Sequence, residues 1–268
     1  MNGRQILIAL SIKFEGDWKK IYQAVNEKDL DNLDEYIEMF NHSKCNAVTM
    51  LDKEYPQILK EIYNPPFVLF YYGDITLAYN PNKCISIIGS RLPSNYGTKM
   101  VNVLAKDLSK HYIIVSGLAR GIDGLSHRSA IEAGNKTIAI IGSGIDNCYP
   151  PDNLDLYYEM KKNHLVLSEY FGKVTPDKDH FPLRNRIIAG LSKATLIIEA
   201  HTHSGTSITA SFALSFSRIV LAVPGRADSD SACNRLIKEG AVLVENANDV
   251  IEELEDTPFV GKEIQQNS

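Results

Sequence analysis

From residue 84 onward, short apolar runs alternate with segments of helical length. This alternation constrains the fold of the chain more than any other feature of the sequence. The runs are CISIIG, YIIVSG, TIAIIG, LVLSEY, TLIIEA and IVLAVPG, and most of them end in glycine or a small polar residue. Strands of a parallel sheet are apolar throughout because helices cover both faces of the sheet. The sequence therefore predicts an α/β fold with a Rossmann-like, doubly wound, mainly parallel sheet.

The first 62 residues follow a different pattern. The segments WKKIYQAV, LDNLDEYIEMF and YPQILKEIY place apolar residues three and four positions apart, which is typical of amphipathic helices. A pair of prolines and the apolar run FVLFYY then mark a change, because proline ends a helix. We therefore expect a small helical N-terminal domain over residues 1–62, a Rossmann-like domain over residues 63–254 and a polar tail over residues 255–268.

The composition disfavours several classes of protein. The four cysteines are scattered and form no CxxC pair, which argues against a zinc site or a disulfide framework and fits a cytoplasmic location. No apolar stretch approaches the roughly 20 residues that a membrane-spanning helix needs. The motifs of P-loop NTPases, zinc metalloproteases and α/β-hydrolases are absent from the sequence. We therefore expect no cofactor, no bound metal and no membrane segment.

The formal net charge of −5 hides an uneven distribution. Residues 81–244 carry 19 Lys and Arg against 14 Asp and Glu, whereas both ends of the chain are acidic. The predicted Rossmann-like domain is thus mildly basic, which favours an anionic ligand. In open parallel sheets such ligands bind outside the carboxyl ends of the strands, so the residues that follow each strand are the first place to look.

Two of these strand ends hold candidate phosphate contacts. After the first strand, GSRLPSNYG offers the hydroxyl of Ser90 and the guanidinium fork of Arg91, which suits phosphate. After the second, SGLARGID offers Ser116 and Gly117, in a turn whose backbone N–H groups could cradle an anion. The alternatives stay open at this point: Arg91 could form a surface ion pair, and Asp123 could hold its own loop through hydrogen bonds.

The stretch KDHFPLRNRIIAGLS interleaves cations with an aromatic residue. In single-stranded nucleic acid, phosphates pair with cations and bases stack on rings, so Lys178, Phe181, Arg184, Asn185 and Arg186 are candidates for such contacts. We expect a helix to begin near Arg184, where a docked anion would also meet the positive end of the helix dipole. Two residues apart, Arg184 and Arg186 cannot share one helix face, and the sequence does not say which of them points at the ligand. A solvated basic loop is the alternative.

The strand end EAHTHSGTSITA places Ser204, Gly205 and Thr206 just before a predicted helix. The unpaired N–H groups at the start of that helix could receive a phosphate. No set of nucleophile, base and orienting group can be recognised among the strand-end motifs. The rim of the sheet is therefore expected to hold phosphates without breaking bonds.

Six motifs run in order along the chain: GSRxxSxYG, SGLARGIDGLSH, TIAIIGSGIDNCYPPDN, HFPLRNRIIAGLS, EAxxxSGTSITA and AVPG. In order and spacing they resemble the DNA-processing protein A family, DprA/Smf, over roughly residues 52–245. The resemblance implies a Rossmann-like domain that binds single-stranded DNA without sequence preference, protects incoming DNA during natural transformation and loads the RecA recombinase onto it. Members act as homodimers and are not known as enzymes. By motif match, the DNA pocket is expected to be lined by Arg91, Lys178, Phe181, Arg184, Arg186 and the turns at Ser116–Gly117 and Ser204–Gly205.

Three further points qualify the resemblance. Many members carry an N-terminal domain that resembles a sterile alpha motif, and the first 62 residues match it only weakly. A nucleotide phosphoribohydrolase on a related Rossmann-like fold is one alternative, but the family motif PGGxGTxxE has a glutamate where HSGTSITASF has none. A module that contacts a recombinase without touching DNA is the other alternative, and it would not need the basic rim.

Overall fold

A nine-stranded sheet runs through the described part of the chain, in the order β1-β2-β6-β5-β4-β3-β7-β8-β9. The structure is a computed structural model and describes residues 1–202 and 205–256. The strands β3 to β9 pair in parallel, whereas β1 and β2 extend the sheet antiparallel beside β6. The strands are β1 (Asn46–Thr49), β2 (Val68–Gly73), β3 (Cys84–Ile88), β4 (Ile113–Ser116), β5 (Thr137–Ile140), β6 (Leu165–Ser168), β7 (Ala194–Ile197), β8 (Ile219–Ala222) and β9 (Val242–Leu243).

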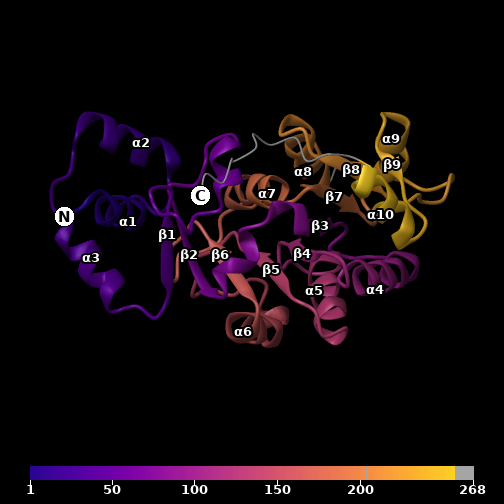
Figure 1. Ribbon diagram of the computed structural model, residues 1–268, viewed down its shortest axis with the longest axis horizontal. Coiled ribbons are helices and arrows are strands. Elements are labelled where there is room, and N and C mark those ends of the chain that lie inside the picture. The colour runs from indigo at the N-terminus through magenta and orange to yellow at the C-terminus, as the bar shows by residue number, and fades with distance from the viewer. Residues whose placement is uncertain (203–204, 257–268) are drawn as a thin grey trace, which may run out of the picture.

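Helices cover both faces of this sheet (Figure 1). The helices α7, α8 and α9 pack on one face, and α4, α5, α6 and α10 pack on the other. The bounds are α1 (Gly3–Lys13), α2 (Trp18–Glu27), α3 (Asp34–Asn41), α4 (Asn95–Leu108), α5 (Ile122–Glu132), α6 (Leu154–Asn163), α7 (His180–Leu191), α8 (Gly205–Ser215), α9 (Ala232–Lys238) and α10 (Ala247–Asp256). Short 3-10 helices span η1 (Gln57–Glu61), η2 (Ile75–Ala78), η3 (Pro81–Lys83) and η4 (Pro151–Asn153). The predicted doubly wound, mainly parallel α/β fold is confirmed.

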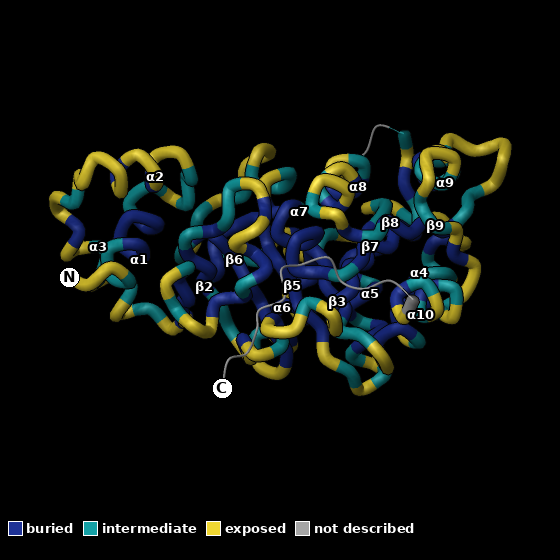
Figure 2. Tube along the Cα trace, turned by 45° about the horizontal axis from the view of Figure 1, so that its top comes forward, coloured by how far each residue is buried: buried dark blue, intermediate teal, exposed yellow. Residues whose placement is uncertain are grey.

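The core lies in two layers because alternate residues of each strand point to opposite faces of the sheet. In β5, Ile138 and Ile140 pack towards α7, whereas Ala139 packs towards α6. In Figure 2 the central strands of the sheet are buried, whereas the outer sides of the helices are exposed. All six apolar runs expected to be strands are strands, which follows from their burial on both faces.

The N-terminal part differs from expectation in two respects. Helices α1, α2 and α3 precede the first strand as expected and share a small core of their own. Residues 46–49, however, form strand β1 and pair with β2, and the expected helix YPQILKEIY is only the short 3-10 helix η1. The chain thus joins the sheet before residue 62, and the division into domains at that residue stays a prediction.

The strand order places a topological switch point between β3 and β7. From β3 the chain continues outward to β4, β5 and β6 on one side, and it later returns to β7 beside β3 and proceeds to β8 and β9. The loops that leave the carboxyl ends of β3 and β7 therefore diverge to opposite sides and open a crevice, which is where ligands bind in sheets of this kind. Among the described residues, no helix has the length and apolar character needed to cross a membrane.

One histidine of the core is buried in its neutral form. His127 on α5 is fully buried, with Nδ1 at 2.6 Å from Oγ1 of Thr137. Its Nε2 has no hydrogen-bond partner among the described residues. Burial, with smaller contributions from the charges of His164 and Arg184, lowers the pKa of His127 to about 3. The ring is therefore a structural group that stays neutral near neutral pH.

The low pKa of His127 predicts that the folded protein loses stability in acid. An unfolded histidine has a pKa of about 6.5, so on acidification the unfolded chain takes up this proton before the folded protein does. Stability is then lost as the pH falls from about 6.5 towards 3, by ~2 kcal/mol from this group between about pH 6.5 and 5. Urea unfolding at about pH 7.5 and 5 should show a smaller loss for His127→Gln than for the wild type, and an unchanged loss for the exposed control His111→Gln. An equal loss in all three proteins would contradict the assignment.

Candidate functional site

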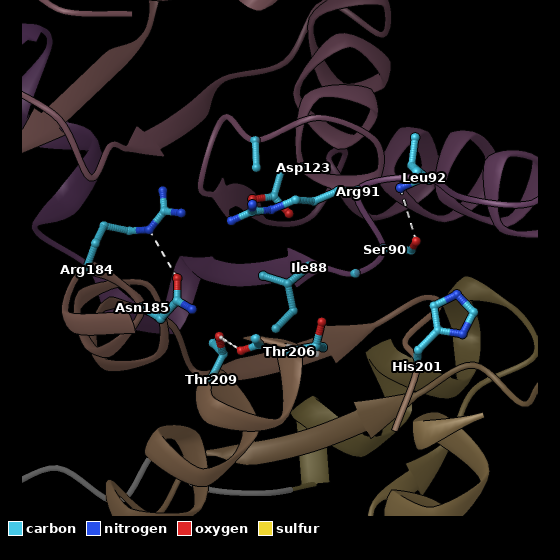
Figure 3. A pocket seen from close by; sticks show the side chains of 13 residues that line it. Ile88, Ser90, Arg91, Leu92, Asp123, Arg184, Asn185, His201, Thr206 and Thr209 are labelled. Carbon is cyan, nitrogen blue, oxygen red and sulfur yellow. Dashed lines mark hydrogen bonds between the residues drawn. The ribbon is translucent and has the colours of Figure 1, made fainter. Parts of the chain in front are cut away.

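A cavity of about 490 Å³ opens at the switch point between β3 and β7. Figure 3 shows Arg91 and Arg184 reaching into it from opposite sides, close to Asp123. The lining comes from the end of β3 and the loop after it, the loop before α5 and the first turn of α5, helix α7, the loop after β7 and the first turns of α8. The lining residues are Ile88, Gly89, Ser90, Arg91, Leu92, Ala119, Asp123, Arg184, Asn185, His201, Gly205, Thr206 and Thr209.

Arg184 is a buried cation whose hydrogen bonds aim it at this cavity. It lies in the second turn of α7, because that helix begins at His180, four residues earlier than expected. Its Nη1 donates to the carbonyl oxygens of Gly117 (2.6 Å) and Ile140, and its Nε donates to Oδ1 of Asn185 (3.1 Å). In the part of the chain that the structure describes, no hydrogen bond engages Nη2. One end of the guanidinium group therefore remains for a ligand.

The charge around Arg184 is only partly balanced. Burial lowers the pKa of Arg184 to about 10, with Asp123 opposing and Arg91 reinforcing this shift, so the group stays a cation near neutral pH. Asp123 is itself buried, and loss of solvation raises the pKa of its carboxyl group. Two arginines thus face one aspartate in the lining. An anion placed here would relieve the repulsion between the two cations.

Asp123 and Gly117 hold Arg184 in position. Oδ2 of Asp123 accepts a hydrogen bond from the Gly117 N–H (3.1 Å), which confirms the alternative that Asp123 holds its own loop. A Cβ atom at Gly117 would lie 2.5 Å from Nη1 of Arg184 and 2.6 Å from Oδ2 of Asp123. Only glycine allows the chain to pass this close. Its neighbour Ser116 is fully buried and donates to the Ile87 carbonyl oxygen (2.6 Å), so the structure places Ser116 inside the sheet and not in the cavity.

Arg91 connects this cavity to a second one. The guanidinium carbon of Arg91 lies 5.4 Å from the centre of the Phe181 ring, and that ring lies 5.7 Å from the ring of Tyr149. Contacts of this kind combine a cation with exposed π faces. The second cavity has a volume of about 230 Å³ and shares four lining residues with the first. Its lining residues are Arg91, Leu92, Gly117, Ala119, Arg120, Gly142, Tyr149, Pro150, Phe181 and Arg184.

The first turn of α8 supplies backbone donors. Gly205 begins the helix, so Gly205 and Thr206 lie in its first turn and not before it, and both line the larger cavity. The N–H groups of a first helical turn have no partner within the helix and attract anions. Thr209, one turn further on, also lines the cavity and is not among the residues predicted from the sequence. The predicted contact at Ser204 lies outside the described residues.

Besides Ser116, two further predicted residues are not brought into either cavity. Lys178 is exposed on the loop that precedes α7 and is absent from both linings. Arg186 points away from Arg184 and forms a buried ion pair with Glu169, at 2.6 Å and 2.7 Å. Its other donors bond to the carbonyl oxygens of Asn64 and Leu183, so all five N–H groups of the guanidinium are used. Arg186 therefore has no donor left for a ligand.

The structure also brings into the site a residue that the sequence does not single out. Leu92 lines both cavities, and its sequence signal is an apolar residue directly after Arg91 in a polar loop. For Tyr149, in the glycine-rich turn GSGIDNCYP, the sequence leaves open whether it positions that loop, stacks on a ligand or belongs to a plain turn. The structure places its ring beside Phe181. The combined crevice can hold anions through Arg91, Arg184 and the α8 N-terminus, and planar rings through its aromatic wall.

Fold and site together define a class: a Rossmann-like α/β protein whose topological switch point holds a crevice lined by two arginines and two aromatic rings. Residues 46–255 match the sequence model of the family described as DNA recombination-mediator protein A. The chain belongs to this family, also called DprA/Smf.

Known relatives and solved structures agree with this placement. The chain is 42% identical over 231 residues to DNA processing protein DprA of Bacillus subtilis (strain 168), covering 85% of this chain and 77% of that protein. It is 43% identical over 214 residues to DprA of Streptococcus pneumoniae (strain ATCC BAA-255 / R6), covering 79% and 75%. The X-ray structure of DprA from Streptococcus pneumoniae superposes with a TM-score of 0.76 at 36% identity, over 94% of this chain and 93% of that one.

A second solved structure, of DNA processing protein A from Helicobacter pylori, gives insight into the single-stranded DNA binding mode of that protein. It superposes with a TM-score of 0.72 at 29% identity, over 80% of this chain and 97% of that one.

Proposed function

We propose that this protein binds single-stranded DNA in the crevice between β3 and β7. The observation that carries the proposal is the pair of converging arginines, Arg91 and Arg184, which Asp123 alone opposes among the described residues of the lining. Phosphates would pair with these cations and with the N–H groups that begin α8. Bases would stack on Phe181 and Tyr149, which any base can do, so the binding would be independent of sequence. A relative of known structure, the Helicobacter pylori protein, binds single-stranded DNA.

The wider role that we propose is that of a recombination mediator. The family description and the resemblance of the six sequence motifs support a protein that protects incoming DNA and loads RecA recombinase onto it, acting as a homodimer without catalysing a reaction. Lys178 is exposed on the loop that leads into α7, and we propose that it adds a further phosphate contact. Light scattering would test the dimer, and the rate of RecA assembly on single-stranded DNA with and without this protein would test loading.

The binding itself is tested by fluorescence anisotropy with labelled oligo-dT and a duplex of equal length. We expect oligo-dT to bind more tightly than the duplex. If about three phosphates are neutralised, its affinity should fall roughly 20-fold between about 50 and 200 mM salt. Absence of binding to oligo-dT at the lower salt concentration would contradict the proposal. Release of free base from nucleoside monophosphates by the same preparation would instead support the phosphoribohydrolase alternative.

A further inference from the structure

Leu92 is a strongly exposed leucine that lies at the candidate site. Its side chain is 84% exposed, the largest fraction among the big apolar residues in the described part of the chain. Single exposed leucines are ordinary on protein surfaces, and Leu214 on α8 is another, at 61%. Leu92 differs because it lines both cavities of the crevice and stands where they adjoin. Leu214 lines neither.

Hydrogen bonds of Ser90 hold the loop that carries Leu92. Oγ of Ser90 accepts a hydrogen bond from the Leu92 N–H (3.1 Å), and the Ser90 N–H donates to the Glu199 carbonyl oxygen (2.6 Å). The Ser90 carbonyl oxygen in turn accepts from the Ile122 N–H (3.0 Å). A Cβ atom at Gly121 would lie 2.3 Å from that same oxygen, so the two loops are in close contact.

The next anchor follows two residues later. Ser94 caps α4, its Oγ accepting from the Gly97 N–H (3.1 Å), and its own hydroxyl donates to Oε2 of Glu199 (2.5 Å). The backbone on either side of Leu92 is therefore anchored, which keeps this residue beside both cavities. A loop that is held in this way presents its side chain to a partner without first having to be ordered.

We propose that Leu92 is a wedge that separates two successive bases of the bound strand, one in each cavity. The inference rests on the proposed function, since it names how that crevice selects its ligand. The smaller cavity, at about 230 Å³, is several times the roughly 30 Å³ that a water molecule occupies in the liquid, so a planar ring can enter it. Apolar wedges of this kind insert between base steps and unstack them.

The wedge gives the crevice a preference for single strands. A base in a single strand can turn away from its neighbour and into a cavity, whereas a base in a duplex must first give up pairing and stacking. The flanking cations, Arg91 and Arg184, would hold the phosphates on either side of the separated step. Leu92 itself would touch bases and not phosphates, so it should leave the salt dependence of binding unchanged.

The test compares Leu92→Ala with the control Leu214→Ala, which removes an equally apolar exposed side chain outside the crevice. With oligo-dT we expect Leu92→Ala to bind about tenfold more weakly, with the same slope of affinity against salt. The preference for oligo-dT over duplex should shrink by the same factor. An oligonucleotide that contains 2-aminopurine, which brightens on unstacking, should brighten less with Leu92→Ala than with the wild type, whereas Leu214→Ala should match the wild type.

The outcomes separate the wedge from the binding function. If the wild type fails to bind oligo-dT, the proposed function fails and the wedge with it. If the wild type binds and Leu92→Ala matches it in affinity and fluorescence, the wedge alone is overturned. A reduced salt slope in Leu92→Ala would also overturn it, because the effect would then run through a phosphate contact.

Discussion

Replacing Arg91 by alanine is expected to weaken the binding of oligo-dT by about 10- to 100-fold. A hydrogen bond to a charged group contributes ~1.5–3 kcal/mol, and each 1.4 kcal/mol is a factor of about ten in affinity. Arg91 is exposed and forms no ion pair with the described residues. Its removal should therefore spare the fold. The slope of log affinity against log salt should also become shallower by about 0.7 for each phosphate that the variant no longer neutralises.

The matched control is Arg128→Ala. Arg128 lies on α5, forms a surface ion pair with Asp155 at 2.7 Å and lines neither cavity. The control lowers the net charge of the protein by the same amount, so it separates a local contact from a general electrostatic effect. Anisotropy titrations at several salt concentrations would measure both affinity and slope. Equal affinities of the two variants would show that Arg91 does not contact the strand.

The architecture of the sheet could be predicted because its signal is local. Each strand from β3 to β8 is buried on both faces, so its residues are apolar one after another and stand out between helices. Strand β1 carries a weaker signal. Asn46–Thr49 is four residues long, and its place in the sheet depends on pairing with Tyr71 and its neighbours, which follow much later in the chain. No local pattern encodes such a pairing.

Several residues of the candidate site could also be predicted from the sequence. Arg91, Phe181 and Arg184 come from motifs far apart in the chain, yet the rule that parallel strands share a carboxyl edge places them together. Ser116 shows where that rule stops. It is the last residue of β4, and the direction of its side chain is opposite to that of Val115 before it. Its hydroxyl donates to the carbonyl oxygen of Ile87 within the sheet and so does not reach the crevice.

The two arginines of α7 also show that the sequence does not predict which side chain faces the crevice. Helical geometry predicts that Arg184 and Arg186 face different ways, and they do. It cannot predict which one faces the crevice, because that choice depends on Glu169, which lies on another segment. Arg184 keeps an unbalanced charge beside a cavity, and Arg186 has a carboxylate partner of its own. Helix α7 thus carries one arginine that faces the crevice, Arg184, and one that stabilises the fold through an ion pair, Arg186.

Replacing Arg186 by methionine is expected to lower the free energy of unfolding by ~3–5 kcal/mol, since it leaves Glu169 as an unpaired buried charge. Burial alone would lower the pKa of Arg186, but the carboxylate of Glu169 outweighs it and raises that pKa, so Arg186 is a cation in the folded protein. The affinity of the folded protein for oligo-dT should stay within about twofold of the wild type, because Arg186 lines neither cavity.

A double-mutant cycle distinguishes a structural arginine from a DNA contact. Glu169→Gln alone should destabilise the protein, and Arg186→Met combined with Glu169→Gln should cost less than the sum of the single changes by ~2 kcal/mol or more, because neither partner is then left charged. Urea unfolding measures the stabilities, and anisotropy without urea, at a temperature where all variants are folded, measures binding. If Arg186→Met were as stable as the wild type but bound oligo-dT tenfold more weakly, Arg186 would be the DNA contact. The ion pair with Glu169 would then have to open when the strand binds.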